Sequence, residues 1–349
     1  MGNRKGKYVT IKDVAGLAGV SVATVSYVLN NKKVDRITDE TRQKVLQAAK
    51  ELNYRPNIAA QNLKSGKSYI IGLVVPRITD TFYAEIAEGV ECAASEKDYR
   101  IALFVTHDDL QQEKKAFEAL ANMRVAGILV SGIRGDIQVE ENRLFLSMER
   151  QGIPLIQVDR YYDLNGLPSV SNDDYKGSYE MTKWLIGATG KKVALMMPDE
   201  KRTAMEMRSR GFIDASLEME SAQNNRVYRF TFSENNDENM RHCVDEMVAE
   251  GYQVIYDVTG DQNTIEVIRY LNKKGLRVPD EISVAGYDGI NLGDYFTPKL
   301  TTVQQPIARI GAEAVRMLDE LLSGIKLGQK SLKLENQLVI RDSVKIVNK

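Results

Sequence analysis

The chain has 349 residues, 43% of them hydrophobic and 27% charged, with a formal net charge of -1. This composition excludes a disordered or collagen-like chain, and the length suffices for two or three domains. No apolar run reaches the roughly 18 residues of a membrane span, and no apolar stretch follows the charged N-terminus, so we expect a cytoplasmic protein without membrane contact. The distant Cys92 and Cys243 fit neither a disulfide framework nor a metal site, and we expect reduced thiols.

The charge is unevenly distributed along the chain. Thirteen Lys or Arg residues and five Asp or Glu residues lie between Met1 and Ser68, which gives this segment about +8 and leaves the remainder net acidic. A basic segment attached to an acidic body is typical of a protein that meets a polyanion with one part only. A solvated, lysine-rich helical surface explains the same charge and stays open as an alternative.

The basic segment predicts three short helices. Thr10, Ser21 and Thr38 are N-cap candidates, and Gly19 supplies a tight turn between the first two helices. The apolar residues at helical spacing, which predict the buried faces, are Ile11, Val14, Ala15, Ala18, Val25, Val28, Leu29, Val45, Ala48, Ala49 and Leu52. This arrangement indicates a helix-turn-helix unit, against the alternative of a purely structural three-helix bundle.

The outward face of the second of these helices is chemically mixed and carries Val22, Ala23, Ser26, Tyr27 and Asn30. The small side chains of Ala23 and Ser26 are flanked by hydroxyls at Thr24 and Tyr27. Small side chains let a backbone approach a groove, and hydroxyl groups bond to phosphates or base edges. The face therefore favours DNA binding.

From Tyr69 onward, apolar runs alternate with helical segments. The runs cover residues 70–75, 101–105, 127–130 and 155–158, and then 193–197, 227–230, 254–258 and 282–286. Two consecutive sets of such units predict an α/β body of two doubly wound parallel-sheet subdomains. We expect a ligand to bind between them, at the carboxyl ends of the strands.

Polar and aromatic residues follow these predicted strands. The effector-binding candidates are Asp80, Phe82, Tyr83, Asp159, Arg160, Asp173, Arg208, Phe232, Asp261 and Asp288. Carboxylates and arginines bond sugar hydroxyls, and aromatic rings stack on the apolar face of a sugar, so the set suits a carbohydrate. A purine suits the same residues, and each position also has a structural alternative as a turn former, a core residue or an ion-pair partner.

The chain resembles the LacI/GalR family of bacterial regulators, the lactose- and galactose-repressor type. The resemblance begins with TIKDVAGLAGVSVATVSYVLNN at Thr10, and in the body it rests on FYAEIAEGVE, AGILVSG, IPLIQVDR, RSRGFIDA, VPDEISVAGYDG and LTTVQQP. It implies an N-terminal all-α helix-turn-helix domain and a periplasmic-binding-protein-like effector domain. It also implies a homodimeric repressor whose affinity for a pseudo-palindromic double-stranded DNA operator is controlled by a small sugar-like effector. Within the effector set it favours Arg208 and Asp288.

Residues 56–68 are the expected hinge. Residues alone allow an ordinary linker or a helix of about seven residues after Pro56, too short to be stable by itself. The resemblance implies a hinge helix in the minor groove, with Leu63 wedged between central base pairs, Ala60 beneath the kink and Lys64 near the phosphates. The expected DNA-binding set is Thr10, Ser21, Val22, Ala23, Thr24, Ser26, Tyr27, Asn30, Asn57, Ala60, Leu63 and Lys64.

The expected domains are residues 1–55, the helix-turn-helix; 56–68, the hinge; and 69–349, for effector binding and dimerisation. We expect one subdomain to contain about 69–161 and 291–322, and the other about 162–290 and 323–349. Ala84 to Cys92, with Ala84, Ala87, Val90 and Glu91 near one face, is the hypothesis for part of the dimer contact.

Two positions depart from the family pattern. Gly260 stands where many members have Asn or Thr, which removes one ligand hydrogen bond. Tyr27 stands where many members have an arginine that reads guanine, and a single hydroxyl cannot make that bidentate contact.

No motif for catalysis is found: the sequence has only two histidines and no phosphate loop, nucleophile elbow or zinc helix. We expect no enzyme activity, no cofactor and no metal. A catabolite-control-type regulator with a protein corepressor, or one with a purine-type effector, remains the alternative.

Overall fold

The structure, a computed structural model, describes residues 9–29, 37–54, 68–133, 138–161, 166–199, 202–219, 224–231 and 236–347. The contacts within the chain divide it into two units, Met1–Ser68 and Tyr69–Lys349. We call the first unit the head and the second the body.

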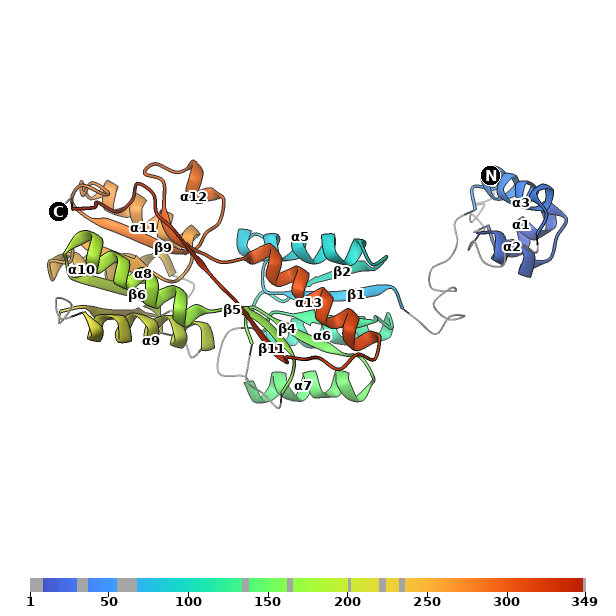
Figure 1. Ribbon diagram of the computed structural model, residues 1–349, viewed down its shortest axis with the longest axis horizontal. Helices are drawn as coiled ribbons and strands as arrows, with labels where there is room; N and C mark the ends of the chain where they lie inside the picture. Colours follow the sequence, from blue (N-terminus) through green and yellow to red (C-terminus); the bar gives the residue numbers. More distant parts are fainter. Residues whose placement is uncertain are drawn as a thin grey trace, which may run out of the picture. The chain divides into compact units, whose positions relative to one another are not determined.

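The described residues of the head form three helices, α1 (Ile11–Ala18), α2 (Val22–Leu29) and α3 (Asp39–Glu51), as Figure 1 shows. The three predicted helices are therefore confirmed. Gly19 ends α1 in the left-handed conformation with φ 66°, which glycine adopts without steric cost. The buried side chains form one small core, made by Val14, Ala15, Val25, Val28, Val45 and Ala48.

None of the described helices is by itself long and apolar enough to cross a membrane. Only α1 and α2 taken together meet the length and composition, and that pair is bent by 103°. Both helices contribute to the head core with α3.

The body contains two six-stranded sheets (Figure 1). The first has the order β11-β5-β4-β3-β1-β2 and the second the order β12-β10-β9-β8-β6-β7. The strands of the first sheet are β1 (Ile70–Val75), β2 (Arg100–Val105), β3 (Gly127–Val130), β4 (Leu155–Val158), β5 (Ser169–Asn172) and β11 (Ser331–Leu334). Those of the second are β6 (Val193–Pro198), β7 (Arg226–Phe230), β8 (Val254–Asp257), β9 (Ser283–Asp288), β10 (Thr301–Gln304) and β12 (Gln337–Val339). Only β12 pairs antiparallel among these described strands, against β10.

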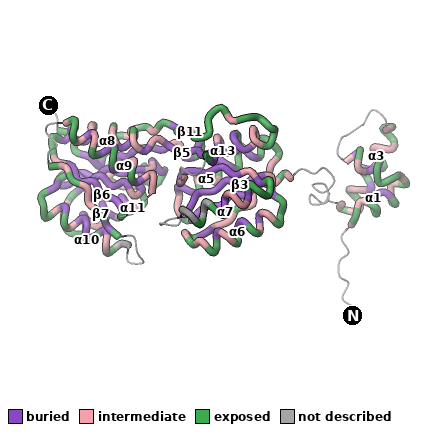
Figure 2. The backbone as a smooth tube through the Cα atoms, turned by 90° about the horizontal axis from the view of Figure 1, so that it is seen from below, coloured by how far each residue is buried: buried purple, intermediate pink, exposed green. Residues whose placement is uncertain are grey.

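Helices cover both faces of each sheet, so the central strands are buried (Figure 2). The helices of the body are α5 (Thr81–Ser95), α6 (Leu110–Asn122), α7 (Gln138–Arg150), α8 (Asp174–Thr189), α9 (Thr203–Glu218), α10 (Asn236–Ala249), α11 (Asp261–Lys273), α12 (Leu292–Tyr295) and α13 (Ile307–Leu322). In β1, Leu73 and Val75 join the core shared with α5 and α13, whereas Val74 joins the core shared with α6 and α7. This alternation is the period of two that a strand imposes on its side chains.

The expected strands are confirmed as β1 to β4 and β6 to β9. The sequence did not reveal β5, β10, β11 and β12, whose sequences SVSN, TTVQ, SLKL and QLV carry mostly polar or alternating residues. Pairing with neighbours, rather than apolar burial alone, holds such strands; Ser169 Oγ of β5, for example, donates a hydrogen bond to Ser331 Oγ of β11 at 3.1 Å.

The subdomain boundaries expected from the sequence are wrong in three places. β5 and β11 lie in the first sheet, whereas the expectation put both segments in the second subdomain. β10 lies in the second sheet, whereas residues 291–322 were assigned to the first subdomain. Apolar runs predict that a strand exists, but the sheet it joins depends on pairing partners distant in sequence.

The chain therefore passes between the sheets at three places, which we call the crossovers. Crossover 1 is Asn172–Asp174, between β5 and α8; crossover 2 is Gln305–Pro306, between β10 and α13. Crossover 3 is Glu335–Asn336, between β11 and β12. Figure 1 shows the C-terminal segment running from β11 in one sheet to β12 in the other.

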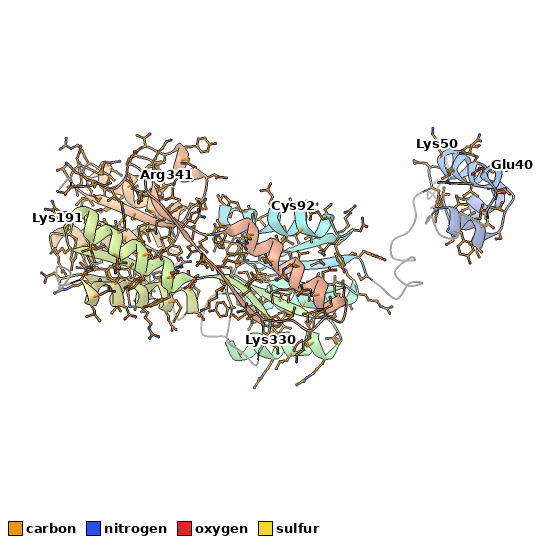
Figure 3. All side chains as sticks on the ribbon, in the orientation of Figure 1. Glu40, Lys50, Cys92, Lys191, Lys330 and Arg341 are labelled. Carbon is orange, nitrogen blue, oxygen red and sulfur yellow. The ribbon has the colours of Figure 1, made fainter. Side chains whose placement is uncertain are left out.

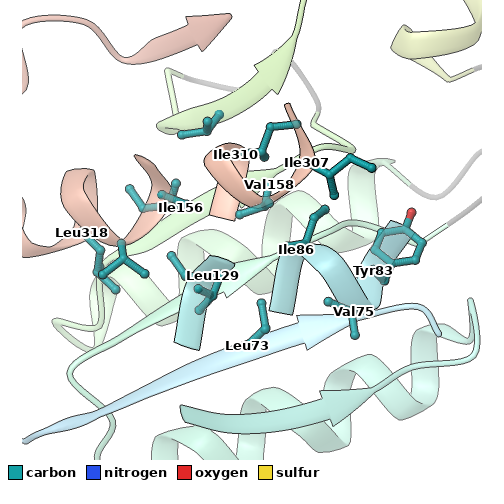
Figure 4. Packing of buried hydrophobic residues seen from close by; sticks show 14 of the residues in the cluster. Leu73, Val75, Tyr83, Ile86, Leu129, Ile156, Val158, Ile307, Ile310 and Leu318 are labelled. Atoms are coloured by element: carbon teal, nitrogen blue, oxygen red, sulfur yellow. The ribbon is translucent and has the colours of Figure 1, made fainter. Parts of the chain in front are cut away.

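Helices α5 and α13 approach closely over the first sheet. A Cβ atom on Gly89 of α5 would overlap the carbonyl oxygen of Ala308, and one on Gly311 of α13 would lie 2.5 Å from the carbonyl oxygen of Ile86. The two glycines therefore let the backbones meet, and the packed side chains beneath them are drawn in Figure 4.

Gly89→Ala is expected to lower the free energy of unfolding by about 1–3 kcal/mol, because backbone atoms of α13 cannot yield to the added methyl group. Gly187→Ala is the matched control: Gly187 lies in α8 with nothing within 4 Å of an added Cβ. Urea unfolding of both variants is the measurement. Equal effects of the two substitutions would contradict this packing.

Candidate DNA-binding face and effector site

Hydrogen bonds at the helix starts fix the geometry of the head. The backbone amide and the hydroxyl of Thr10 both donate to Asp13 Oδ2 at 2.7 Å. At the start of α2, Ser21 Oγ accepts from the Thr24 amide at 3.1 Å and lies 2.9 Å from Thr24 Oγ1. The predicted caps are confirmed, so the hydroxyls of Ser21 and Thr24 have structural partners inside the turn.

The outer face of α2 has the composition that the sequence predicted. Val25 and Val28 are buried, while Val22 is 40% exposed and Tyr27 is 37% exposed. Ala23 is exposed and Ser26 is half-buried. The side chains of the head are drawn in Figure 3, with Glu40 and Lys50 labelled on α3. The face thus presents small, apolar and hydroxyl groups together.

Several predicted site residues lie outside the described residues. They are Asn30, Asn57, Ala60, Leu63, Lys64 and Phe232. Their roles in DNA or effector binding stay predictions from the sequence.

In the first subdomain, Asp159 and Arg160 follow β4 and are both buried. Tyr83 Oη donates to Asp159 Oδ2 at 3.3 Å, and Asp159 has a left-handed backbone with φ 61°. Arg160 Nη1 lies 2.5 Å from Asp108 Oδ1 and donates to the Gly132 carbonyl at 3.1 Å. Burial raises the pKa of Asp159 to about 6, against the lowering effect of Arg160.

Two of the expected stacking residues are committed to the core. Phe82 and Tyr83 are 5% and 4% exposed, and both belong to the cluster under α5 and α13. Figure 4 labels Tyr83 among these packed side chains, with Val75 and Ile307. Of these two side chains, the Tyr83 hydroxyl alone contacts the polar group around Asp159, while both rings lie in the core.

In the second subdomain, Arg208 of α9 is 4% exposed and has a partner on each side. Its Nε lies 2.6 Å from Asp174 Oδ1, and its Nη1 donates to the Val258 carbonyl at 2.8 Å. The guanidinium carbon lies 3.7 Å from the centre of the Tyr287 ring, a cation–π contact. Arg208 is therefore neutralised within the chain.

The carboxylate of Asp261 links the end of β9 to β10 by hydrogen bonds. Its Oδ2 accepts from the amides of Gly289 at 2.8 Å and Ile290 at 3.1 Å, and its Oδ1 accepts from Thr302 Oγ1 at 2.6 Å. The side chain is fully buried, and burial raises its pKa to about 7. These contacts give Asp261 a structural role, and a contact with effector stays a prediction.

Asp80 and Asp173 begin helices. Asp80 Oδ1 accepts from the Phe82 amide at 3.0 Å, and Asp173 Oδ1 accepts from the Lys176 amide at 3.0 Å. Asp288 Oδ1 accepts from Gln305 Nε2 at 2.7 Å, and burial raises the pKa of Asp288 well above its usual value, although Arg208 lowers it.

The structure accounts for the glycine at position 260. Gly260 has φ 130°, and a Cβ there would lie 2.7 Å from Asp288 Oδ2. A side chain at this position would therefore meet both backbone strain and the Asp288 carboxylate.

The polar side chains at the carboxyl ends of both sheets form one electrostatic group. The charges of Arg208, Asp80 and Asp159 all act on Asp288. Some buried polar atoms at these strand ends have no hydrogen-bond partner among the described residues: Thr106 Oγ1, Ser131 Oγ, Arg160 Nε, Asn172 Oδ1 and Gln305 Oε1. Buried polar atoms normally have partners, so the strand ends have capacity for the donors and acceptors of a ligand. No group of three or more His, Cys, Asp or Glu among the described residues is arranged to hold a metal ion.

Comparison with known proteins identifies the family. Residues 10–57 match the family described as bacterial regulatory proteins, lacI family, and residues 68–338 match the periplasmic binding proteins and sugar binding domain of LacI family. The chain belongs to the LacI family. The helix-turn-helix and the two α/β subdomains are the parts that these matches cover.

Similar proteins match nearly the whole length of the chain. The transcriptional repressor PurR of Histophilus somni is 33% identical over 337 residues, with 96% of this chain and 99% of that protein covered. The lac repressor dimer, solved with operator and the anti-inducer ONPF, is 25% identical with a TM-score of 0.82, covering 97% of this chain and 99% of that one. The regulator CelR in complex with cellobiose is 26% identical with a TM-score of 0.67, covering 96% and 99%. This LacI-family protein is thus similar to transcriptional regulators.

Sequence analysis missed the partners of the predicted arginines. Asp108 pairs with Arg160, Asp174 pairs with Arg208, and Tyr287 lies under the Arg208 guanidinium. Asp174 adjoins β5 and Tyr287 lies at the end of β9, so their places at strand ends were the available signal.

The hypothesis for the dimer contact needs correction at one position, Val90. Val90 is fully buried and Ala87 is partly buried against the first-subdomain core. Ala84, Glu91 and Cys92 are exposed on α5, and Cys92 is labelled in Figure 3. Val90 follows Ile86 at helical spacing and packs inward with it, so only the other residues of this segment remain candidates.

Asp174→Ala is expected to lower the free energy of unfolding by about 3–5 kcal/mol, because the Arg208 charge stays buried without its partner. Glu335→Ala is the control, since Glu335 also forms an ion pair, with Lys176 of α8, but is 79% exposed. Urea unfolding is the measurement. The control is expected to unfold like the wild type.

The double variant Asp174→Leu/Arg208→Met removes both charges and is expected to recover much of the lost stability. If Asp174→Ala alone unfolded at the wild-type urea concentration, the pair would not be the buried, interdependent one described.

Proposed function

We propose that this protein is a cytoplasmic, homodimeric repressor that binds a pseudo-palindromic DNA operator and responds to an uncharged, hydroxyl-rich effector. It acts by binding and not by catalysis. The observation that supports DNA binding most strongly is the exposed face of α2, on a capped helix-turn-helix within the region that matches the lacI family. The charge of about +8 on residues 1–68 supports the same role.

The charges at the strand ends favour an uncharged effector. Arg160 and Arg208 are already paired with Asp108 and Asp174. The charges of Asp80 and Asp159 both act on Asp288, so a phosphate at this place meets like charges that the two paired arginines do not offset. Hydroxyl groups of a sugar, by contrast, donate to carboxylates and accept from the unpartnered Arg160 Nε.

A purine-type effector is the second candidate, because the residue set suits it as well. It is supported less, since Phe82 and Tyr83 bury their rings in the core and Arg208 covers one face of Tyr287. A stacking ring would have to come from elsewhere.

The effector class is tested by isothermal titration of the full-length protein. Uncharged mono- and disaccharides are expected to bind at least about tenfold more tightly than their phosphate esters, a difference of about 1.4 kcal/mol. Tighter binding of the esters would contradict the assignment, and binding of a purine base alone would favour the second candidate. Absence of binding by all of them would favour a protein corepressor.

Effector affinity is expected to fall with acidity. A hydroxyl donates a stronger hydrogen bond to an ionised carboxylate than to a neutral carboxyl group, and the pKa of Asp159 is raised to about 6 by burial. Lowering the pH from 7 to 5 reduces the ionised fraction of such a group about tenfold, and the affinity with it. The Asp159→Asn variant is expected to bind effector more weakly at pH 7 and to show no such fall in affinity between pH 7 and pH 5. If Asp159→Asn showed the same fall in affinity as the wild type, Asp159 would be excluded as the cause of the pH dependence.

Operator recognition is tested by selecting bound duplexes from a random pool with the full-length protein at a fixed salt concentration. The proposal predicts enrichment of a two-fold symmetric site with an easily kinked central step. Tyr27→Ala is expected to relax selection at the base pair that Tyr27 faces, whereas the control Leu17→Ala, 49% exposed on α1, is not. Sites that keep a strong guanine there, unchanged in Tyr27→Ala, would contradict the role of Tyr27.

A further inference from the structure

The Tyr287 hydroxyl lies where two of the three crossovers meet. It accepts from Asn336 Nδ2 of crossover 3 at 3.0 Å and from Asn172 Nδ2 of crossover 1 at 3.4 Å. It donates to the carbonyl oxygen of Asp174 at 3.5 Å. A phenol hydroxyl has one donor and two acceptor sites, so all of its hydrogen-bonding capacity is used on the crossovers.

The asparagines also join the crossovers to each other. Asn336 Nδ2 uses its second hydrogen to donate to the carbonyl oxygen of Asp173, at 3.0 Å. Asn172 Nδ2 donates to Asp174 Oδ1 at 3.1 Å, the same oxygen that lies 2.6 Å from Arg208 Nε. Crossovers 1 and 3 are thus linked both directly and through Tyr287.

Crossover 2 is held by the residue that follows Tyr287. The Gln305 amide donates to the Asp288 carbonyl at 2.9 Å, and Gln305 Nε2 donates to Asp288 Oδ1 at 2.7 Å. Residues 287 and 288 at the end of β9 therefore contact all three connections between the subdomains.

The packing around the Tyr287 hydroxyl leaves no spare room. A Cβ on Gly177 of α8 would lie 2.5 Å from Asn336 Nδ2 and 2.8 Å from Tyr287 Oη. Tyr287 itself is fully buried, and its ring carries the Arg208 guanidinium. Close-packed interiors shift between discrete arrangements rather than deform continuously. A displacement of crossover 1 is therefore transmitted through these contacts to crossover 3, and the reverse.

We propose that the Tyr287 hydroxyl is a joint that makes crossovers 1 and 3 move together, so that Tyr287 is a positioning residue for regulation. Any rotation of one subdomain against the other bends all three crossovers. A ligand that contacts Arg208 or Asp288 acts on the joint directly, because Arg208 lies on the Tyr287 ring and Asp288 is its neighbour. The regulatory part of this inference depends on the proposed function, whereas the mechanical part does not.

The test variant is Tyr287→Phe, which keeps the ring beneath Arg208 and removes only the hydroxyl. Tyr256→Phe is the matched control. Tyr256 is also fully buried, in the neighbouring strand β8, and its hydroxyl has no hydrogen bond to a crossover among the described residues. Both variants therefore lose one buried hydroxyl from the same sheet.

The first measurement is amide hydrogen exchange of the free, full-length protein. Tyr287→Phe is expected to speed exchange in crossovers 1 and 3 by roughly fivefold, the factor for one hydrogen bond of about 1 kcal/mol. Tyr256→Phe is expected to leave the crossovers unchanged. Faster exchange confined to β9 in Tyr287→Phe would overturn the proposal.

The second measurement repeats the exchange with a duplex that the full-length protein has selected. In the wild type and in Tyr256→Phe, bound duplex is expected to change exchange at crossovers 1 and 3 together. In Tyr287→Phe the head is expected to be protected as before, while the shared response of the crossovers is lost. A purely structural hydroxyl would leave that response intact, which would overturn the regulatory role.

The two measurements separate the two proposals. Duplex that protects the head of the wild type without changing its crossovers would overturn the regulatory role and leave DNA binding standing. Absence of any selected duplex would overturn the proposed function, and the exchange of the free protein would still decide whether Tyr287 joins the crossovers.

Discussion

A guanidinium and a carboxylate, on Arg208 and Asp174, are buried together where the chain passes from the first sheet to the second. Removing both charges from water is costly, and the cost is offset only when the remaining hydrogen-bonding groups also find partners. The Val258 carbonyl and the Tyr287 ring supply these partners to Arg208, and Asn172 supplies one to Asp174. The pair thus constrains residues from both sheets.

The carboxyl ends of the strands also contain the connections between the two sheets. Parallel strands place their carboxyl ends at one edge, where a ligand meets side chains from several of them. Here the same edge contains the connections between the two sheets, since β5, β10 and β11 each run directly into a crossover. The residues expected to contact a ligand are therefore neighbours of the residues that connect the two sheets.

The sequence predicted local features well. The caps at Ser21 and Thr38, the turn at Gly19 and the long apolar strands depend on residues close together in the chain, and all are confirmed. The sheet that β5 or β11 joins was not predictable, because it depends on pairing over more than 150 residues, as between Ser169 and Ser331.

The candidate site was predictable as a set of positions and not as a set of contacts. Arg208 and Arg160 were identified from the sequence, but their neutralising partners are brought to them by other helices and loops. Phe82 and Tyr83 follow a strand as ligand-stacking residues would, yet their rings fill the core beneath α13. Whether a polar or aromatic side chain faces a ligand is decided by packing between elements, which a local pattern does not contain.

A double-mutant cycle tests whether the Tyr287 hydroxyl connects crossovers 1 and 3. Tyr287→Phe and Asn336→Ala are combined, and the free energy of unfolding of the body is measured in urea for all four proteins. The account predicts that the two losses overlap, with an interaction energy of about 0.5–3 kcal/mol. Losses that add within about 0.3 kcal/mol would show that Tyr287 and Asn336 act independently and would contradict it.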